Sequence, residues 1–215
     1  MSKNKKIIIA SILILVVLFI VYILQSTNDF KSALTTYMRL AHTHVDDAYV
    51  PGVPDNPVRQ RLNSVLSQVL ARPMKPAERL ALATEGLAAL KDAEKQIDAI
   101  GDAGDKVQNA ISYMEEKNNA LGALATRAQG TEIIALAKQE SNIIADIRGL
   151  SYRANFRTAE IFNRIVLDRG ELTPAYTQEL NSQIPAVEDQ FNKRTALYDQ
   201  LKSLTARLEK AVVAL

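Results

Sequence analysis

The chain has 215 residues, with 26 Lys and Arg against 24 Asp and Glu, no Cys, and only 8 Gly and 7 Pro. The lack of Cys excludes disulfides, thiolate metal sites and a Cys nucleophile, and the shortage of turn residues disfavours a β-sandwich or β-barrel. Three basic residues lie among the first six, which leaves 23 basic against 24 acidic side chains, a near-neutral mixture that gives no reason to expect nucleic-acid binding.

The first predicted element is an apolar helix over residues 7–24, IIIASILILVVLFIVYIL. As an α-helix it spans about 27 Å, close to the ~30 Å hydrocarbon core of a bilayer. A buried core helix is the weaker interpretation, because a segment that is apolar on every face has no side for water. Lysines 3, 5 and 6 precede it, so the positive-inside rule predicts a cytoplasmic tail at residues 1–6.

A cleaved signal peptide is the alternative to an uncleaved anchor. The apolar stretch is long for a signal peptide, and Gln25 to Asn28 do not form an A-x-A-like cleavage site. We therefore expect a single-pass protein of the cell membrane, held in the lipid bilayer by residues 7–24. Its body is then expected in the periplasm or outside the cell.

Residues 25–48 are predicted to continue as a juxtamembrane helix, because apolar residues recur there at helical spacing, namely Phe30, Leu34, Tyr37, Met38 and Ala41. Residues 49–57 are a predicted linker, since four helix breakers follow one another there: Pro51, Gly52, Pro54 and Pro57.

Residues 58–215 are predicted to form an antiparallel bundle of about four or five helices. A short helix ends before Pro73, and Pro76 begins the next helix, which extends to about Ile100. The GDAG stretch at 101–104 predicts a turn. After a helix over 107–124, Gly130 is the expected C-cap and Thr131 the next N-cap.

The fourth helix is predicted to run through Leu150 and on to Ile165, and RGELTP at 169–174 predicts a break, with Thr173 as N-cap and Pro174 as the first helical residue. The last helix carries apolar residues at heptad spacing, interrupted by Arg194 and Thr205; these residues are Ile184, Val187, Phe191, Tyr198, Leu201, Leu208, Val212 and Leu215. Such a stripe is typical of core packing, and a coiled-coil seam for a partner helix is the alternative.

Both histidines of the chain lie in one stretch, LAHTHVDDAYVPGVPDNP, residues 40–57. In an extended segment His42, His44 and Asp46 would point to one face and could bind Zn²⁺ or another divalent ion with further ligands. In a helix the two histidines diverge. The other interpretation is a polar, solvated joint outside the membrane.

A second candidate site is IRGLSYRANFRTAEIFNR, residues 147–164. Arg153 and Arg157 are i, i+4 neighbours there, flanked by Tyr152 and Phe156, and they predict a site for an anion or a partner. Glu160 offers the ordinary alternative of a surface ion pair.

Signatures of catalysis are missing: there is no Gly-rich phosphate loop, no H-E-x-x-H and no G-x-S-x-G. We expect no enzyme activity, no catalytic residues and no cofactor. The VDDAYVPG stretch, residues 45–52, resembles the segment after the anchor in membrane-fusion adaptors of secretion and efflux pumps, but those proteins continue with β-rich regions and helices are predicted here. One N-terminal anchor followed by long helices is similar to the layout of the LemA family, a likeness that carries no shared motif.

The leading hypothesis is a membrane-anchored extracytoplasmic helical scaffold or protein-interaction module, with a protein partner or a second copy of the chain. A ligand-sensing helical bundle that acts through a separate signalling partner is the alternative, and an enzyme ranks third.

Overall fold

The computed structural model describes residues 3–52, 55–122, 125–167 and 174–215. Its elements are α1 (Lys3–Tyr49), the 3-10 helix η1 (Val50–Gly52), α2 (Pro57–Ala71), α3 (Pro76–Ala120), α4 (Ala125–Leu167) and α5 (Pro174–Val213). These ranges contain helices and no strand, so the prediction of an all-helical chain is confirmed.

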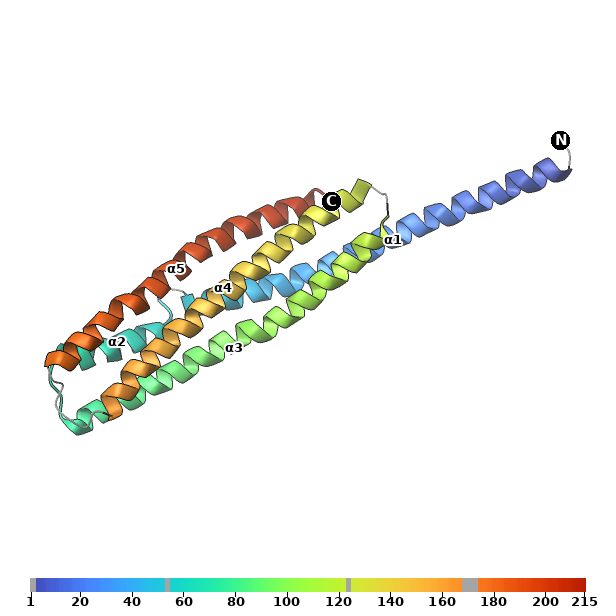
Figure 1. The fold of residues 1–215 in the computed structure, drawn as a ribbon. Coiled ribbons are helices and arrows are strands. Elements are labelled where there is room, and N and C mark those ends of the chain that lie inside the picture. The colour runs from blue at the N-terminus through green and yellow to red at the C-terminus, as the bar shows by residue number, and fades with distance from the viewer. Residues whose placement is uncertain (1–2, 53–54, 123–124, 168–173) are drawn as a thin grey trace.

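Helix α1 is a single helix of 47 residues whose two halves have different surroundings. Most large apolar side chains between Ile12 and Leu24 are exposed, from 49% at Ile20 to 64% at Leu15, whereas Phe30 and Tyr37 are buried. Figure 1 shows the first half projecting from the molecule and the second half lying along the other helices. Within the described ranges α1 is the one helix long and apolar enough to cross a membrane.

The second half of α1 packs with α2 to α5 around three clusters of buried apolar side chains. The largest joins α1, α3, α4 and α5 and contains Tyr37, Met114, Ile133 and Leu208. A second cluster joins α2, α3 and α4, and a third surrounds Ala48 at the end of α1. We call these packed helices, from Ser26 of α1 to Val213 of α5, the helical body. Figure 1 shows its successive long helices running in opposite directions.

Several helix ends follow the predicted signals. Helix α2 ends at Ala71 and α3 begins at Pro76, as predicted. Asn56 caps α2, because its side chain accepts hydrogen bonds from the backbone N–H groups of the second and third helical residues. Pro174 is the first residue of α5, while the rest of the predicted break, including Thr173, lies outside the described residues. Of the predicted linker, residues 53–54 also lie outside them.

Two predicted helix boundaries are wrong. Helix α3 runs through GDAG at 101–104, and α4 runs through Gly130 and Thr131. A Cβ atom on Gly101 would lie 2.7 Å from the guanidinium carbon of Arg148, and one on Gly130 would collide with Asn118. These glycines therefore allow side chains of the neighbouring helix to approach the backbone closely. The actual turn follows Leu121, where Gly122 has a φ of +62°.

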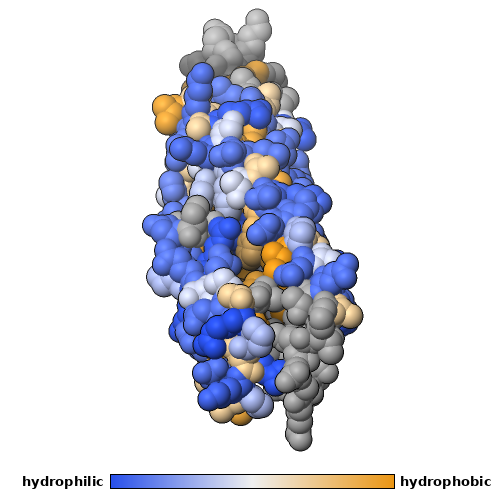
Figure 2. All heavy atoms as spheres, turned by 90° about the vertical axis from the view of Figure 1, so that its left-hand side faces the viewer, coloured by the Kyte–Doolittle hydropathy of each residue, from blue (hydrophilic) through white to orange (hydrophobic). Residues whose placement is uncertain are grey.

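The interior of the helical body is apolar and the end furthest from the N-terminus is mainly hydrophilic, with hydrophobic side chains visible between the helices (Figure 2). The heptad stripe of α5 faces this interior: Val187, Tyr198, Leu201 and Leu208 are buried. Arg194, one of the two residues that interrupt the stripe, is buried as well.

Candidate functional site

Thr205, the other interruption of the heptad stripe, belongs to a polar cluster that joins three helices. Its hydroxyl donates a 2.6 Å hydrogen bond to Oε1 of Glu140 on α4, and the hydroxyl of Tyr37 on α1 donates a 2.7 Å bond to Oε2. Glu140 is 1% exposed. Burial raises the pKa of Tyr37, and the adjacent Glu140 raises it further, so the phenol keeps its proton and remains a donor. Both carboxylate oxygens thus accept hydrogen bonds, and the cluster has a structural role because it links α1, α4 and α5.

Arg194 forms the centre of a second polar cluster, in which some hydrogen-bond donors have no acceptor among the described residues. The Arg194 residue is 3% exposed. Its Nη1 donates a 2.9 Å hydrogen bond to Oγ of Ser151, and the guanidinium carbon lies 4.7 Å from the ring centroid of Phe191. Burial lowers the pKa of Arg194 to about 10; Tyr198 opposes this shift and the positive charge of Arg59 adds to it. Arg194 therefore stays charged at neutral pH, and among the described residues Nε and Nη2 have no acceptor.

An inner cavity of about 20 Å³ lies beside Arg194. Its lining includes Ser151 and Asn155 of α4, Arg59 of α2 and Phe191 of α5. A cavity of this size has room for one or two water-sized groups. Nδ2 of Asn155 is also buried with no acceptor within the described residues.

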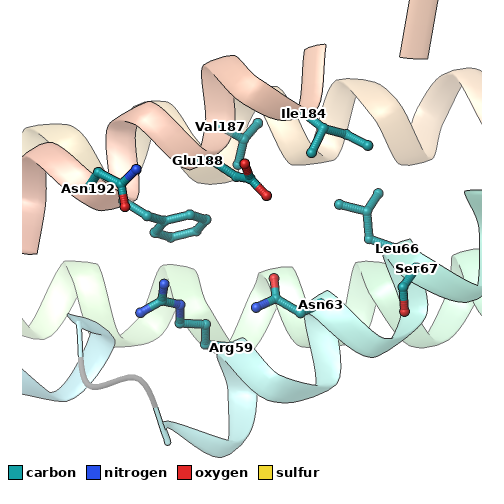
Figure 3. A pocket seen from close by; sticks show the side chains of 9 residues that line it. Arg59, Asn63, Leu66, Ser67, Ile184, Val187, Glu188 and Asn192 are labelled. Atoms are coloured by element: carbon teal, nitrogen blue, oxygen red, sulfur yellow. The ribbon is translucent and has the colours of Figure 1, made fainter. Parts of the chain in front are cut away.

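An outer cleft of about 490 Å³ lies between α2 and α5, and Arg59 and Phe191 line both spaces. Figure 3 shows Arg59 and Asn63 of α2 and Glu188 of α5 pointing into the space between the two helices. The cleft also has apolar lining, from Leu66, Ile184, Val187 and Phe191. Apolar walls with a few convergent polar groups are typical of small-molecule sites.

Of the three residues predicted to bind a metal, His44 lies on a different side of α1 from His42 and Asp46. His42 is exposed, with Nε2 3.8 Å from Oε1 of Glu209 on α5. His44 is 2% exposed beside Gly104 on α3, and Asp46 is exposed. Burial lowers the pKa of His44. The segment is helical, so the two histidines diverge. Among the described side chains, no group of three His, Cys, Asp or Glu could hold a metal ion.

The residues predicted to bind an anion or a partner, Arg153 and Arg157, are both exposed on α4. Nε of Arg153 donates a 3.5 Å hydrogen bond to Gln190 of α5. Tyr152 and Phe156 are 61% and 58% exposed in the same stretch. None of the four lines the inner cavity or the outer cleft. The buried arginine beside the inner cavity is Arg194, and its position as one of two polar residues in an apolar heptad stripe is the sequence signal for it.

Comparison with known proteins adds no further constraint. A scan against protein-family models, a search of curated proteins and a search of solved structures each found no match. The functional inferences below therefore rest on the residues of this chain and their geometry.

Proposed function

We propose that the protein is a single-pass membrane protein that presents its helical body outside the cytoplasm as an interaction module for other proteins. The observation that carries this proposal is the continuity of α1. One helix contains both the uncharged, exposed segment and the half that is buried in the helical body. A segment apolar on every face is stable in lipid and unfavourable in water.

This continuity would hold the helical body at a fixed distance from the bilayer. The hydroxyl of Tyr22, near the end of the apolar segment, donates a 3.0 Å hydrogen bond to the carbonyl of Ala120, the last residue of α3. Tyr is enriched at the membrane–water interface because its ring is apolar and its hydroxyl is polar. The helical body would thus begin directly at the membrane surface, without a flexible tether.

The exposed stretch of α4 supports an interaction with a protein. Tyr152, Arg153, Phe156 and Arg157 form two exposed i, i+4 pairs, one aromatic and one basic. Tyr and Arg are enriched among residues that dominate the binding energy of protein interfaces. A partner protein, or a second copy of this chain, would cover this surface.

Membrane topology can be tested with single cysteines, because the chain has none. Asp102, exposed on α3, and Ser2 would each be changed to Cys. A membrane-impermeant maleimide is expected to label D102C in intact cells and S2C only after lysis, and the mature chain should retain its N-terminus. Labelling of S2C alone in intact cells would reverse the orientation, and loss of residues 1–24 would identify a signal peptide.

The partner can be tested by photo-crosslinking in native membranes. A photo-reactive residue at Phe156 is expected to give a discrete adduct that disappears when Arg153 and Arg157 are both changed to Glu. The same residue at Gln200, an exposed position on α5, is the control. Equal adducts from both positions, or none from either, would contradict an interface on α4.

A second candidate function, ligand sensing, is favoured by the outer cleft and its connection to α1. Tyr198 lies one turn after Arg194 on α5, and its hydroxyl donates a 2.7 Å hydrogen bond to the carbonyl of Ala48. Its ring stacks on Tyr49, with ring centroids 4.9 Å apart. A ligand that moved α5 at the cleft would therefore act on the end of α1, the helix that leads to the membrane.

A further inference from the structure

The unpaired nitrogens of Arg194 lie on one edge of its guanidinium. Nη1 donates a hydrogen bond to Oγ of Ser151, whereas Nε and Nη2 have no acceptor among the described residues. Nε–H and Nη2–H point in parallel, which is the geometry that pairs with the two oxygens of a carboxylate. Arg194 is a buried residue, and a buried charge whose paired N–H edge has no acceptor is costly unless an anion binds to it.

The inner cavity beside Arg194 is lined by further donors and, among the residues described, by no carboxylate. Asn155 is 9% exposed, and its Nδ2 is a further donor without an acceptor in the described part of the chain. Arg59 lines the same cavity and contributes a second positive charge. No acidic residue lines the inner cavity among the residues described. A water molecule accepts hydrogen bonds but leaves the positive charge uncompensated, so an anion matches this set of groups better.

We propose that the protein binds a small organic acid, with its carboxylate on Arg194 in the inner cavity and its apolar part in the outer cleft. The inner cavity is too small for more than the head of such a molecule, at about 20 Å³. The outer cleft, at about 490 Å³, is large enough for the remainder and offers Leu66, Ile184 and Val187 to an alkyl or aromatic group. Glu188 and Arg59 both line the outer cleft, so its lining offers no net positive charge to a second anionic group, and a monocarboxylate is the ligand class that fits.

The proposal does not depend on the membrane orientation or on a protein partner, so it is tested on the purified full chain in lipid nanodiscs. Butyrate and 1-butanol are suitable probes, because they have the same chain length and differ in charge. Isothermal titration calorimetry is expected to show one butyrate site per chain and at least tenfold weaker binding of 1-butanol. Butyrate, but not 1-butanol, is also expected to raise the unfolding temperature.

Arginine variants identify the site. Arg194→Met keeps an unbranched side chain without the charge and should weaken butyrate binding at least tenfold. Arg194→Lys keeps the charge but lacks the paired N–H edge, and a loss of at least tenfold is expected again. Arg153→Met, the same change at an exposed arginine of α4, should bind butyrate as the unmodified chain does.

Three results would overturn the proposal: no butyrate binding by the unmodified chain, equal binding of butyrate and 1-butanol, or normal butyrate binding by Arg194→Lys. A loss of binding in Arg153→Met together with normal binding in Arg194→Met would move the site to the exposed arginines. Circular dichroism of each variant checks that the helices have formed, and Arg194→Lys carries the test if Arg194→Met does not fold.

Discussion

Replacement of Gly86 by Ala tests how closely α3 and α4 pack. Gly86 is buried on α3, and a Cβ atom placed there would lie 2.5 Å from Cζ and 2.6 Å from Cε1 of Phe162 on α4. Phe162 is fully buried in the cluster that also contains Val65 and Leu90. The ring therefore has no exposed direction in which to move, and relief requires a shift of the whole helix contact.

Two opposing effects determine whether Gly86→Ala raises or lowers the free energy of unfolding. Ala is favoured over Gly inside a helix by about 1 kcal/mol, while an extra methyl group in a packed core costs about 1–3 kcal/mol. Contacts this far below van der Waals distance lie at the upper end of that range, so Gly86→Ala should lower the free energy of unfolding by about 1–2 kcal/mol. At Gly149 the nearest atom to an added Cβ is Nη1 of exposed Arg153, at 3.5 Å. Gly149→Ala should therefore raise stability by about 0.5–1 kcal/mol.

The assay is urea unfolding of the full chain in detergent micelles, followed by far-ultraviolet circular dichroism. The matched variants Gly86→Ala and Gly149→Ala should move the midpoint in opposite directions. A third variant, Gly86→Ala with Phe162→Leu, should lose less than the two single changes added together, because the smaller side chain makes room for the methyl group. A Gly86→Ala chain as stable as the original, or strict additivity with Phe162→Leu, would refute the close contact.

Three further predictions concern polar side chains. Tyr37→Phe removes a donor to a buried carboxylate and should lower the free energy of unfolding by about 1.5–3 kcal/mol, whereas the same change at exposed Tyr152 should stay within about 0.5 kcal/mol. Burial lowers the pKa of His44, so below about pH 6.5 the unfolded chain takes up a proton that the folded chain does not. Stability should therefore fall on acidification, and His44→Gln should reduce this fall. Asn56→Ala removes the cap of α2 and should cost about 1 kcal/mol. Urea titrations at several pH values measure all three, and a pH slope unaffected by His44→Gln would contradict the second.

Local signals predicted the helices well and their interruptions less well. Pro76 and Pro174 begin helices as expected, because the fixed φ of Pro and its missing N–H act on the chain around it whatever lies nearby. Glycine is a weaker signal, because it occurs both at helix ends and inside helices where another side chain approaches the backbone. Gly101 and Gly130 were expected at helix ends, yet each lies inside a helix where a partner side chain passes close to the backbone. That partner is distant in sequence, as Arg148 is from Gly101, so the local pattern could not reveal it.

The same limit applies to the candidate site. Arg194 and Thr205 stand out in the sequence as polar residues within an apolar stripe, which marks them as unusual core positions. The heptad pattern does not show which side chains contact Arg194 and Thr205 in the folded chain. Thr205 contacts a carboxylate, whereas Arg194 donates to the hydroxyl of Ser151, lies near the ring of Phe191 and is affected by the positive charge of Arg59. The difference depends on residues of α1, α2 and α4 brought together by the fold.

Ligand sensing depends on the end of α1, where Ala48 and Tyr49 contact Tyr198. A ligand shifts a conformational equilibrium only when it binds one state more tightly than the other. An acid bound to Arg194 would compensate a buried charge while its apolar part contacts both α2 and α5, so it would favour the state in which these helices lie close together. Tyr198 is one helical turn from Arg194, and a change in α5 there would act on α1 directly. Without the ligand, the same continuous helix would simply hold the helical body against the membrane. Replacement of Tyr198 by Phe separates the two functions, because it removes the hydrogen bond to Ala48 and leaves both Arg194 and the exposed stretch of α4 in place. Ligand-dependent changes at the membrane should weaken in this variant, while butyrate binding and the crosslink from Phe156 should persist.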